Sequence, residues 1–324
     1  MLMNSLAAMC AGFAINILFG DPPNGISLRN VIPRFAKLVE RRLKKHYKNS
    51  AEAHRFAGFV LLLLCLIIFA LIPSLAVWLT YKHAPVISFI IECLLCWSAF
   101  SVMHTKIELD RMRRQLKVGR IDLARTSLSK LLGTDCSDMN EQALIRRAVE
   151  CAADTAADNG AGVLFWAALF GGPGAVFFRT ASLLRRTYSG RGEQSLDFGI
   201  AAYRLWMIMD FVPAFICGAL SNFAAAILGL YTSECFDVYR RDRKKLASPN
   251  LAPCRCVLAS ALGITLTPKS FLRNGKVIFI TVGDDRREPH FDDPETAAAV
   301  MFAAVSFTML LFFALKLLFI ILVG

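Results

Sequence analysis

The chain has 324 residues, of which 56% are hydrophobic, and its mean hydropathy is +0.49. This composition excludes an ordinary soluble domain, because the apolar residues are gathered in long blocks with almost no charge. The net charge of +12 lies between those blocks, which is typical of segments that flank membrane helices and contact lipid headgroups. We therefore expect an all-α integral membrane protein with about four to six membrane helices, surrounded by the lipid bilayer and without a nucleic-acid partner.

The N-terminal third contains three apolar blocks. The first, 2–19, lacks a basic leading region and a cleavage site, so we expect a retained helix that ends at Gly20-Asp21-Pro22-Pro23 rather than a signal peptide. The second, 56–79, is uncharged over 24 residues, which is enough to cross a hydrocarbon core of roughly 30 Å. The third, 86–103, contains Glu92 and follows after a short connection. These last two blocks predict a hairpin of membrane helices.

Basic residues set the expected orientation of the chain. Segment 20–55 holds nine Lys and Arg residues, segment 105–159 holds ten, and segment 231–296 holds eleven. Because an excess of Lys and Arg marks cytoplasmic segments, we expect these three segments to be cytoplasmic.

The cytoplasmic segment 105–159 has helical spacing of its apolar residues in two stretches. They are 106–132 and 140–158, separated by a turn in which Asp138 or Asn140 can act as the N-cap. No repeat or low-complexity tract interrupts them.

Three acidic residues, Glu150, Asp154 and Asp158, recur at every fourth position and so share one helix face. Carboxylates in this arrangement can hold a magnesium ion that carries a phosphate. The alternative is a solvated helix face, paired with Arg146 and Arg147. From the residues alone both interpretations stay open.

The next apolar segment, 162–178, is short for a membrane helix and is broken by Gly171-Gly172-Pro173-Gly174. Five arginines follow it, at 179, 185, 186, 191 and 204. A helix–break–helix hairpin that enters the membrane and returns keeps them cytoplasmic. Six full crossings, with 179–204 outside, remain the alternative. Segment 205–230, which contains Asp210, poses the same question.

The C-terminal third predicts a loop at Ser248-Pro249-Asn250, a strand at 276–282 and a last membrane helix at 297–323. In that helix Lys316 is close enough to the end to extend toward the interface. The cysteines and histidines form no zinc motif. We expect Cys93 and Cys96, inside an apolar block, to be packed in the core.

Taken in order, these fragments resemble the CobD/CbiB family of membrane-bound cobalamin biosynthesis proteins, the adenosylcobinamide-phosphate synthases, and the related AmpE-like proteins. The matching residues run over nearly the whole chain. They are Gly20-Asp21-Pro22-Pro23, Val39-Glu40-Arg41-Arg42-Leu43, Asp135, Glu150, Leu164-Phe165-Trp166, Gly171-Gly172-Pro173-Gly174-Ala175, Asp197-Phe198-Gly199, Pro213-Ala214, Ser248-Pro249-Asn250, Ala261-Leu262-Gly263, Gly283-Asp284 and Arg286-Arg287-Glu288-Pro289.

The resemblance implies a single membrane domain over 1–324 and a place in the bacterial cytoplasmic membrane. It implies a ligase that uses ATP and magnesium to join adenosylcobyric acid to an aminopropanol or ethanolamine phosphate, giving adenosylcobinamide phosphate. The substrates would be a corrinoid and an amino-alcohol phosphate, and other membrane proteins of cobalamin assembly are possible partners.

The resemblance also assigns site residues. The expected catalytic residues are Glu150, Asp154 and Asp158, the last two as magnesium ligands. The expected substrate- and phosphate-binding residues are Asp21, Arg179, Arg185, Arg186, Arg204, Asn250, Asp284 and Arg287.

This chain departs from the family at several polar positions. It has Ser182-Leu183-Leu184-Arg185-Arg186 where the family has an amide and a carboxylate, and Trp206-Met207 where the family has paired aspartates. A second hypothesis is therefore a non-catalytic, AmpE-like sensory or accessory protein that keeps the fold.

Overall fold

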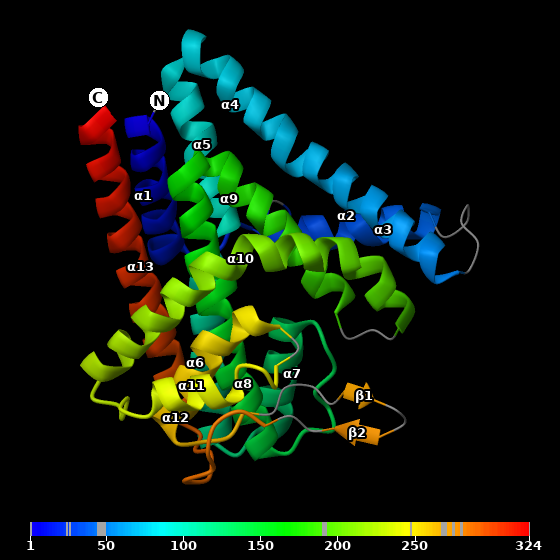
Figure 1. Cartoon of the computed structure of the whole chain (residues 1–324), viewed down its shortest axis with the longest axis vertical. Coiled ribbons are helices and arrows are strands. Elements are labelled where there is room, and N and C mark those ends of the chain that lie inside the picture. The colour runs from blue at the N-terminus through cyan, green and yellow to red at the C-terminus, as the bar shows by residue number, and fades with distance from the viewer. Residues whose placement is uncertain are drawn as a thin grey trace. The chain divides into compact units, whose positions relative to one another are not determined.

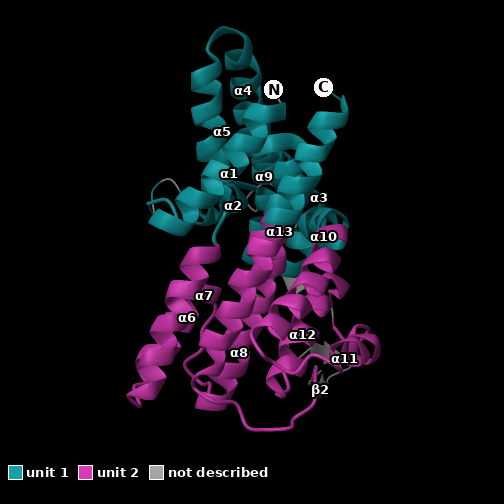
Figure 2. Ribbon diagram, turned by 90° about the vertical axis from the view of Figure 1, so that its left-hand side faces the viewer, with its two compact units in different colours: residues 1–101, 162–211, 310–324 teal, residues 102–161, 212–309 magenta. Residues whose placement is uncertain are grey.

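The structure is a computed structural model that describes residues 2–23, 25, 27–43, 50–189, 193–246, 248–266, 271–273, 276–278 and 281–323. Helices make up nearly all of it (Figure 1). The chain divides into two compact units, coloured separately in Figure 2. The first comprises residues 1–101, 162–211 and 310–324, and the second comprises 102–161 and 212–309.

The first unit is built around three helices that pack on one another, namely α1, α5 and α9. Small residues permit the close approach: a Cβ on Gly12 of α1 would lie 2.5 Å from the Cβ of Cys96 in α5. The elements of this unit are α1 (Leu2–Phe19), α2 (Leu28–Leu43), α3 (Ala51–Leu66), the π-helical turn η1 (Ile67–Leu71), α4 (Ile72–His83), α5 (Pro85–Ala99) and α9 (Val163–Tyr188).

Six helical stretches of the described residues are long and apolar enough to cross a membrane. They are Leu2–Phe19, Ala51–His83, Pro85–Lys117, Glu141–Tyr188, Ser195–Ile227 and Asp293–Val323. Many of their large apolar side chains face outward, such as Trp78 and Ile87, which suits contact with lipid tails. The chain is therefore a multi-pass, all-α membrane protein, as its composition predicts.

The expected break inside α9 is present. Gly171 has φ 69° and ψ −158°, a conformation outside the helical region that is essentially restricted to glycine. Gly174 lies directly against the carbonyl of Trp166, eight residues earlier, where a continuous helix would carry it a full two turns away. The chain therefore turns back on itself at this point, and α9 consists of two half-helices.

The second unit contains α6 (Val102–Lys117), α7 (Ile121–Leu132), α8 (Glu141–Thr155), η2 (Ala156–Gly162, whose last residue belongs to the first unit), α11 (Cys235–Asp242), η3 (Pro249–Leu251) and α12 (Ala252–Leu262). Two long helices, α10 (Glu193–Ile227) and α13 (Asp293–Val323), contribute residues to both units. Every residue of α12 is buried, and α12 packs on α8. This contact positions the candidate site.

The helix predicted to start near Asn140 is confirmed, and the one predicted over 106–132 is corrected. Asn140 is the N-cap of α8, since its side chain accepts a hydrogen bond from the N–H of Ala143 at 2.8 Å. The predicted helix 106–132 is two helices, α6 and α7, because Gly119 has φ +74° and ends the first.

The predicted strand at 276–282 begins as β2 (Lys276–Ile278), which pairs antiparallel with β1 (Phe271–Arg273), a strand the sequence did not indicate. Val282 forms an isolated bridge with Leu266 instead of continuing β2. Residues 279–280, within the predicted strand, lie outside the described part of the chain.

Candidate functional site

The acidic face of α8 lies in a network of buried charges. Two carboxylates on this face of α8, Glu150 and Asp154, are each paired with an arginine, Arg147 from α8 itself and Arg255 from α12. Asp158, one turn on in the π-helical segment η2, is fully buried. Two positive and two negative charges are thus gathered where α8 meets α12.

Asp154 and Arg255 form a two-pronged ion pair. The Nε and Nη2 of Arg255 donate to the two oxygens of Asp154, each at 2.7 Å. The guanidinium is only 7% exposed. Burial opposes its charge, but Asp154 and Glu150 outweigh burial and raise the pKa of Arg255. The cation is therefore permanent and fixed in orientation.

Glu150 is fully buried and accepts from Arg147, one turn earlier. Its second oxygen, Oε1, has no hydrogen-bond partner among the residues that the structure describes. The predicted pairing with Arg147 is confirmed, whereas Arg146 binds Asp285 instead. The predicted solvated face is wrong, because α12 covers it. A buried acceptor without a donor has unused capacity to bind one.

The arrangement does not fit the expected magnesium site. Both oxygens of Asp154 already accept from Arg255, so its negative charge is neutralised by protein. Within the described ranges no group of three His, Cys, Asp or Glu side chains converges as metal ligands would. A hard divalent ion prefers unpaired carboxylate oxygens, so we derive no step through magnesium at these residues.

A second network surrounds Asp242 at the end of α11. Arg241, Lys245 and the N–H of Gly283 all contact its buried carboxylate. Burial alone would raise the pKa of Asp242, but these donors outweigh burial and lower it. Asp284, predicted to bind substrate, accepts from Nη1 of the same Arg241 at 2.8 Å.

The other predicted residues of the second unit are also engaged. Arg287 binds Asp293 through both terminal nitrogens, at 2.6 and 3.0 Å, and the N–H of His290 donates to the same carboxylate. Asn250 is buried in η3. Asp284 and Arg287 are therefore paired with residues other than Glu150.

The remaining predicted residues belong to the first unit. Asp21, just after α1, accepts from Ser101 at 2.6 Å and from Asn16 at 3.2 Å, so it ties the end of α1 to the end of α5. Arg185 stacks on Trp206, with 3.7 Å from guanidinium carbon to ring centroid. Arg179 is buried, Arg186 is half-buried and Arg204 is exposed. That Arg185 and Arg186 oppose the acids of α8 stays a prediction.

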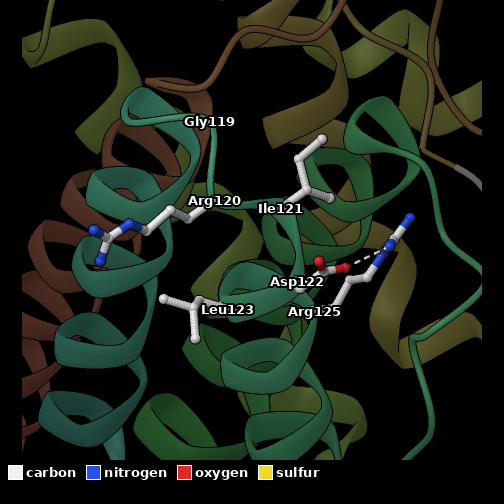
Figure 3. Close-up of a pocket in the computed structure, with 6 residues that line it drawn as sticks. All are labelled: Gly119, Arg120, Ile121, Asp122, Leu123 and Arg125. Carbon is white, nitrogen blue, oxygen red and sulfur yellow. Dashed lines mark hydrogen bonds and ion pairs between the residues drawn. The ribbon is translucent and has the colours of Figure 1, made fainter.

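A surface pocket of about 400 Å³ lies at the turn from α6 to α7 (Figure 3). Its lining includes the ion pair of Asp122 and Arg125, at 2.8 Å, whose side chains turn toward each other in the close-up. None of the predicted site residues lines it. We therefore place the candidate site at α8 and α12 rather than here.

The comparison with protein families decides what this fold belongs to. The family model described as CobD/Cbib protein matches residues 9–301. The chain belongs to the CobD/CbiB family. This confirms the resemblance read from the motifs, and the match extends through both compact units.

Individual CobD/CbiB relatives are distant but match along nearly their full length. The chain is 27% identical over 282 residues to "Cobalamin biosynthesis protein CobD" of Clostridium perfringens, which covers 87% of this chain and 89% of that protein. It is 26% identical over 314 residues to the protein of the same name in Clostridium tetani, 96% of each. It is 25% identical over 317 residues to that of Photorhabdus laumondii, 97% and 98%. No solved structure matches the chain significantly.

Sequence reasoning missed Arg255 and Asp242. Arg255 is the only charged residue in the otherwise apolar helix α12, and an isolated charge of that kind signals a buried partner. Its partner, 101 positions away, could not be read from the sequence. Asp242 stood within a basic run, where nothing set it apart from an ordinary surface charge.

Proposed function

We propose that the chain serves cobalamin biosynthesis by catalysing amide formation between adenosylcobyric acid and an aminopropanol or ethanolamine phosphate, with ATP consumed. Membership of the CobD/CbiB family over 9–301 supports this proposal. So do the names of the relatives, which are cobalamin biosynthesis proteins. The observation that carries it within the molecule is the charge network of α8 and α12.

That network suits a substrate that carries both an amine and a phosphate. Arg147, whose side chain is 17% exposed, offers positive charge to a phosphate. The free oxygen of Glu150 offers an acceptor to the amine. Opposite charges held one helical turn apart match the two ends of a short amino-alcohol phosphate.

The proposed reaction forms one C–N bond. The amine nitrogen attacks the corrinoid carboxyl carbon after ATP has activated that carboxyl group by phosphoryl or nucleotidyl transfer, and the activating group leaves with the carboxyl oxygen. The amine must lose a proton as the bond forms, and we assign Glu150 as the acceptor of that proton. Arg255 occupies both oxygens of Asp154, so Glu150, and not Asp154, has an oxygen available to accept that proton.

The alternative is the non-catalytic, AmpE-like role. One observation favours it: the carboxylate of Asp154, expected to carry a metal ion, is filled by Arg255 instead. A protein that kept the fold but lost the reaction would have a site filled by its own side chains.

Complementation tests the proposal. The chain is expressed in a bacterium that lacks its own adenosylcobinamide-phosphate synthase and is grown where cobalamin must be made from cobyric acid. We expect growth with the native chain, little or no growth with Glu150→Gln, and full growth with the matched control Glu141→Gln, at the exposed start of α8. Membrane levels of all three proteins are measured in parallel.

Rescue by the native chain would exclude the non-catalytic role. Absence of rescue, with the protein present in the membrane at normal level, would exclude the proposed reaction. If Glu150→Gln supported full growth, the proposed reaction would still be supported, but the role assigned to Glu150 would be excluded.

A further inference from the structure

Two ionisable residues outside the proposed site are buried in apolar helices of the first unit. Glu92 in α5 is 7% exposed and Lys316 in α13 is 6% exposed. The sequence led us to expect that Lys316 extends to the interface, which is wrong, because the side chain turns inward. Charges in a membrane helix are expensive and persist where partners hold them. The groups that hold Glu92 and Lys316 lie at the break in α9.

Lys316 lies at the end of the first half-helix. Its ammonium donates to Ser5 Oγ at 2.8 Å and to the carbonyl of Ala167 at 3.3 Å. Since the helix is broken at Gly171, the carbonyls of its last four residues, which include Ala167, have lost their helical partners. A cation at this end also matches the partial negative charge of the helix dipole.

Glu92 lies at the start of the second half-helix. Its Oε1 accepts from the N–H of Gly172 at 3.3 Å. Pro173 follows, a residue suited to the first helical position because it has no N–H to leave unpaired. An anion at this end matches the partial positive charge of the dipole. Each opened end of the interrupted helix thus faces a charge of the sign it favours.

We propose that Glu92 and Lys316 are a matched pair of charged caps that hold α9 broken inside the apolar part of the first unit. Their order is fixed: the cation belongs at the carbonyl end and the anion at the amide end. A direct attraction between the two charges would be the same whichever residue carried which sign. The pair holds the second half-helix, which carries Arg179, at its angle to the first (Figure 1).

The experiment separates capping from simple ion pairing by inverting the pair. Full-length native protein and Glu92→Lys/Lys316→Glu are purified in mild detergent, and amide hydrogen exchange is followed by mass spectrometry over residues 163–180. We expect the amides just after Gly171 to exchange about tenfold faster or more in the inverted protein. Exchange at the native rate in the inverted protein would overturn the proposal, since the order of the two charges would then make no difference.

A double variant without either charge tests the proposal if the inverted protein fails to fold. Glu92→Met/Lys316→Met leaves no lone buried charge, so we expect its unfolding temperature to stay near the native one. The amides after Gly171 should still exchange faster, because neither end is capped. Native exchange at the break in this variant would overturn the proposal. Lys82→Met, at the exposed end of α4, is the control and should change neither measurement.

Discussion

At the scale of single residues, this protein is organised by pairs of buried opposite charges. Asp154 with Arg255 is the clearest example; Asp242 is buried as well, although its partners Arg241 and Lys245 are 48% and 44% exposed. A buried pair stabilises little by itself, because desolvation offsets much of the attraction. Removal of one member costs far more, since it leaves the other charge alone in an apolar surrounding. Single substitutions should therefore be more harmful than double ones.

The first residue-scale prediction concerns Asp154. Asp154→Asn should lower the free energy of unfolding by about 3 kcal/mol, because Arg255 keeps its charge without a carboxylate. Asp154→Asn/Arg255→Met should recover much of this loss. Asp285→Asn is the control, since Asp285 pairs with Arg146 but its side chain is 58% exposed; we expect a change below about 1 kcal/mol. Thermal unfolding in detergent measures all three, and a double variant no better than the single one would contradict the pairing.

The second residue-scale prediction concerns acid stability. The pKa of Asp242 is lower in the folded protein than in the unfolded chain, so its contribution is complete above the unfolded value of about 4. It is lost as pH falls from there toward the folded pKa. The difference in unfolding temperature between native protein and Asp242→Asn should thus be largest near neutrality and shrink as pH falls below about 4. A difference that stays constant or grows in acid would contradict this assignment.

At the scale of elements, α9 is the one whose local sequence dictates an unusual form. Three glycines and a proline in four residues remove both the steric bias toward a helix and one amide donor. Gly171 takes up the positive φ, Pro173 begins the second half-helix, and Gly174 allows the chain to pass against Trp166. The break is therefore encoded locally, whereas its stability depends on charges brought by α5 and α13.

The prediction at this scale is a substitution at the break. Gly171→Ala should destabilise the protein strongly, because a Cβ there would lie 2.7 Å from Ser5 Oγ and closer still to Glu92 Oε1. Gly133→Ala is the matched control, since Gly133 has a similar φ of +68° but nothing within 4 Å of its Cβ position. We expect Gly133→Ala to lower the free energy of unfolding by about 1–2 kcal/mol through backbone strain alone. Gly171→Ala should lower it by clearly more. Equal losses in thermal unfolding would show that the break is not crowded.

At the scale of the whole molecule, six apolar helical stretches make this a multi-pass membrane protein, and the family match extends from the first to the last of them. The segment 162–178 is part of the stretch Glu141–Tyr188, which is interrupted at Gly171. An interrupted helix can enter and leave a membrane on one side. The cytoplasmic location of the basic segments, and the single domain over 1–324, stay predictions.

The whole-molecule prediction is that 160–178 does not cross the bilayer. Arg191, one of the arginines behind this expectation, lies outside the described residues. A cysteine at the exposed Ser189, in a background without the native cysteines, should be shielded from a membrane-impermeant thiol reagent in intact cells. The same cysteine should react after the membrane is opened. Ready labelling in intact cells would establish six full crossings instead.

The sequence by itself determined the features that depend on neighbouring residues. The membrane class, the end of α1 at Phe19, the cap at Asn140 and the break at Gly171 all follow from composition or from local backbone chemistry. The family could also be read from the order of its motifs, because such motifs record local turns and close approaches as well as chemistry.

Only the tertiary structure decided which charges meet. The solvated face expected for α8 is buried under α12, Asp154 is bound by an arginine 101 positions away, and Lys316 turns inward to α9 instead of out to the interface. The physical reason is that the energy of a charge depends on burial and on partners, and both are set by helices that are distant in sequence. The periodicity of one helix shows which side chains share a face, but not what covers that face.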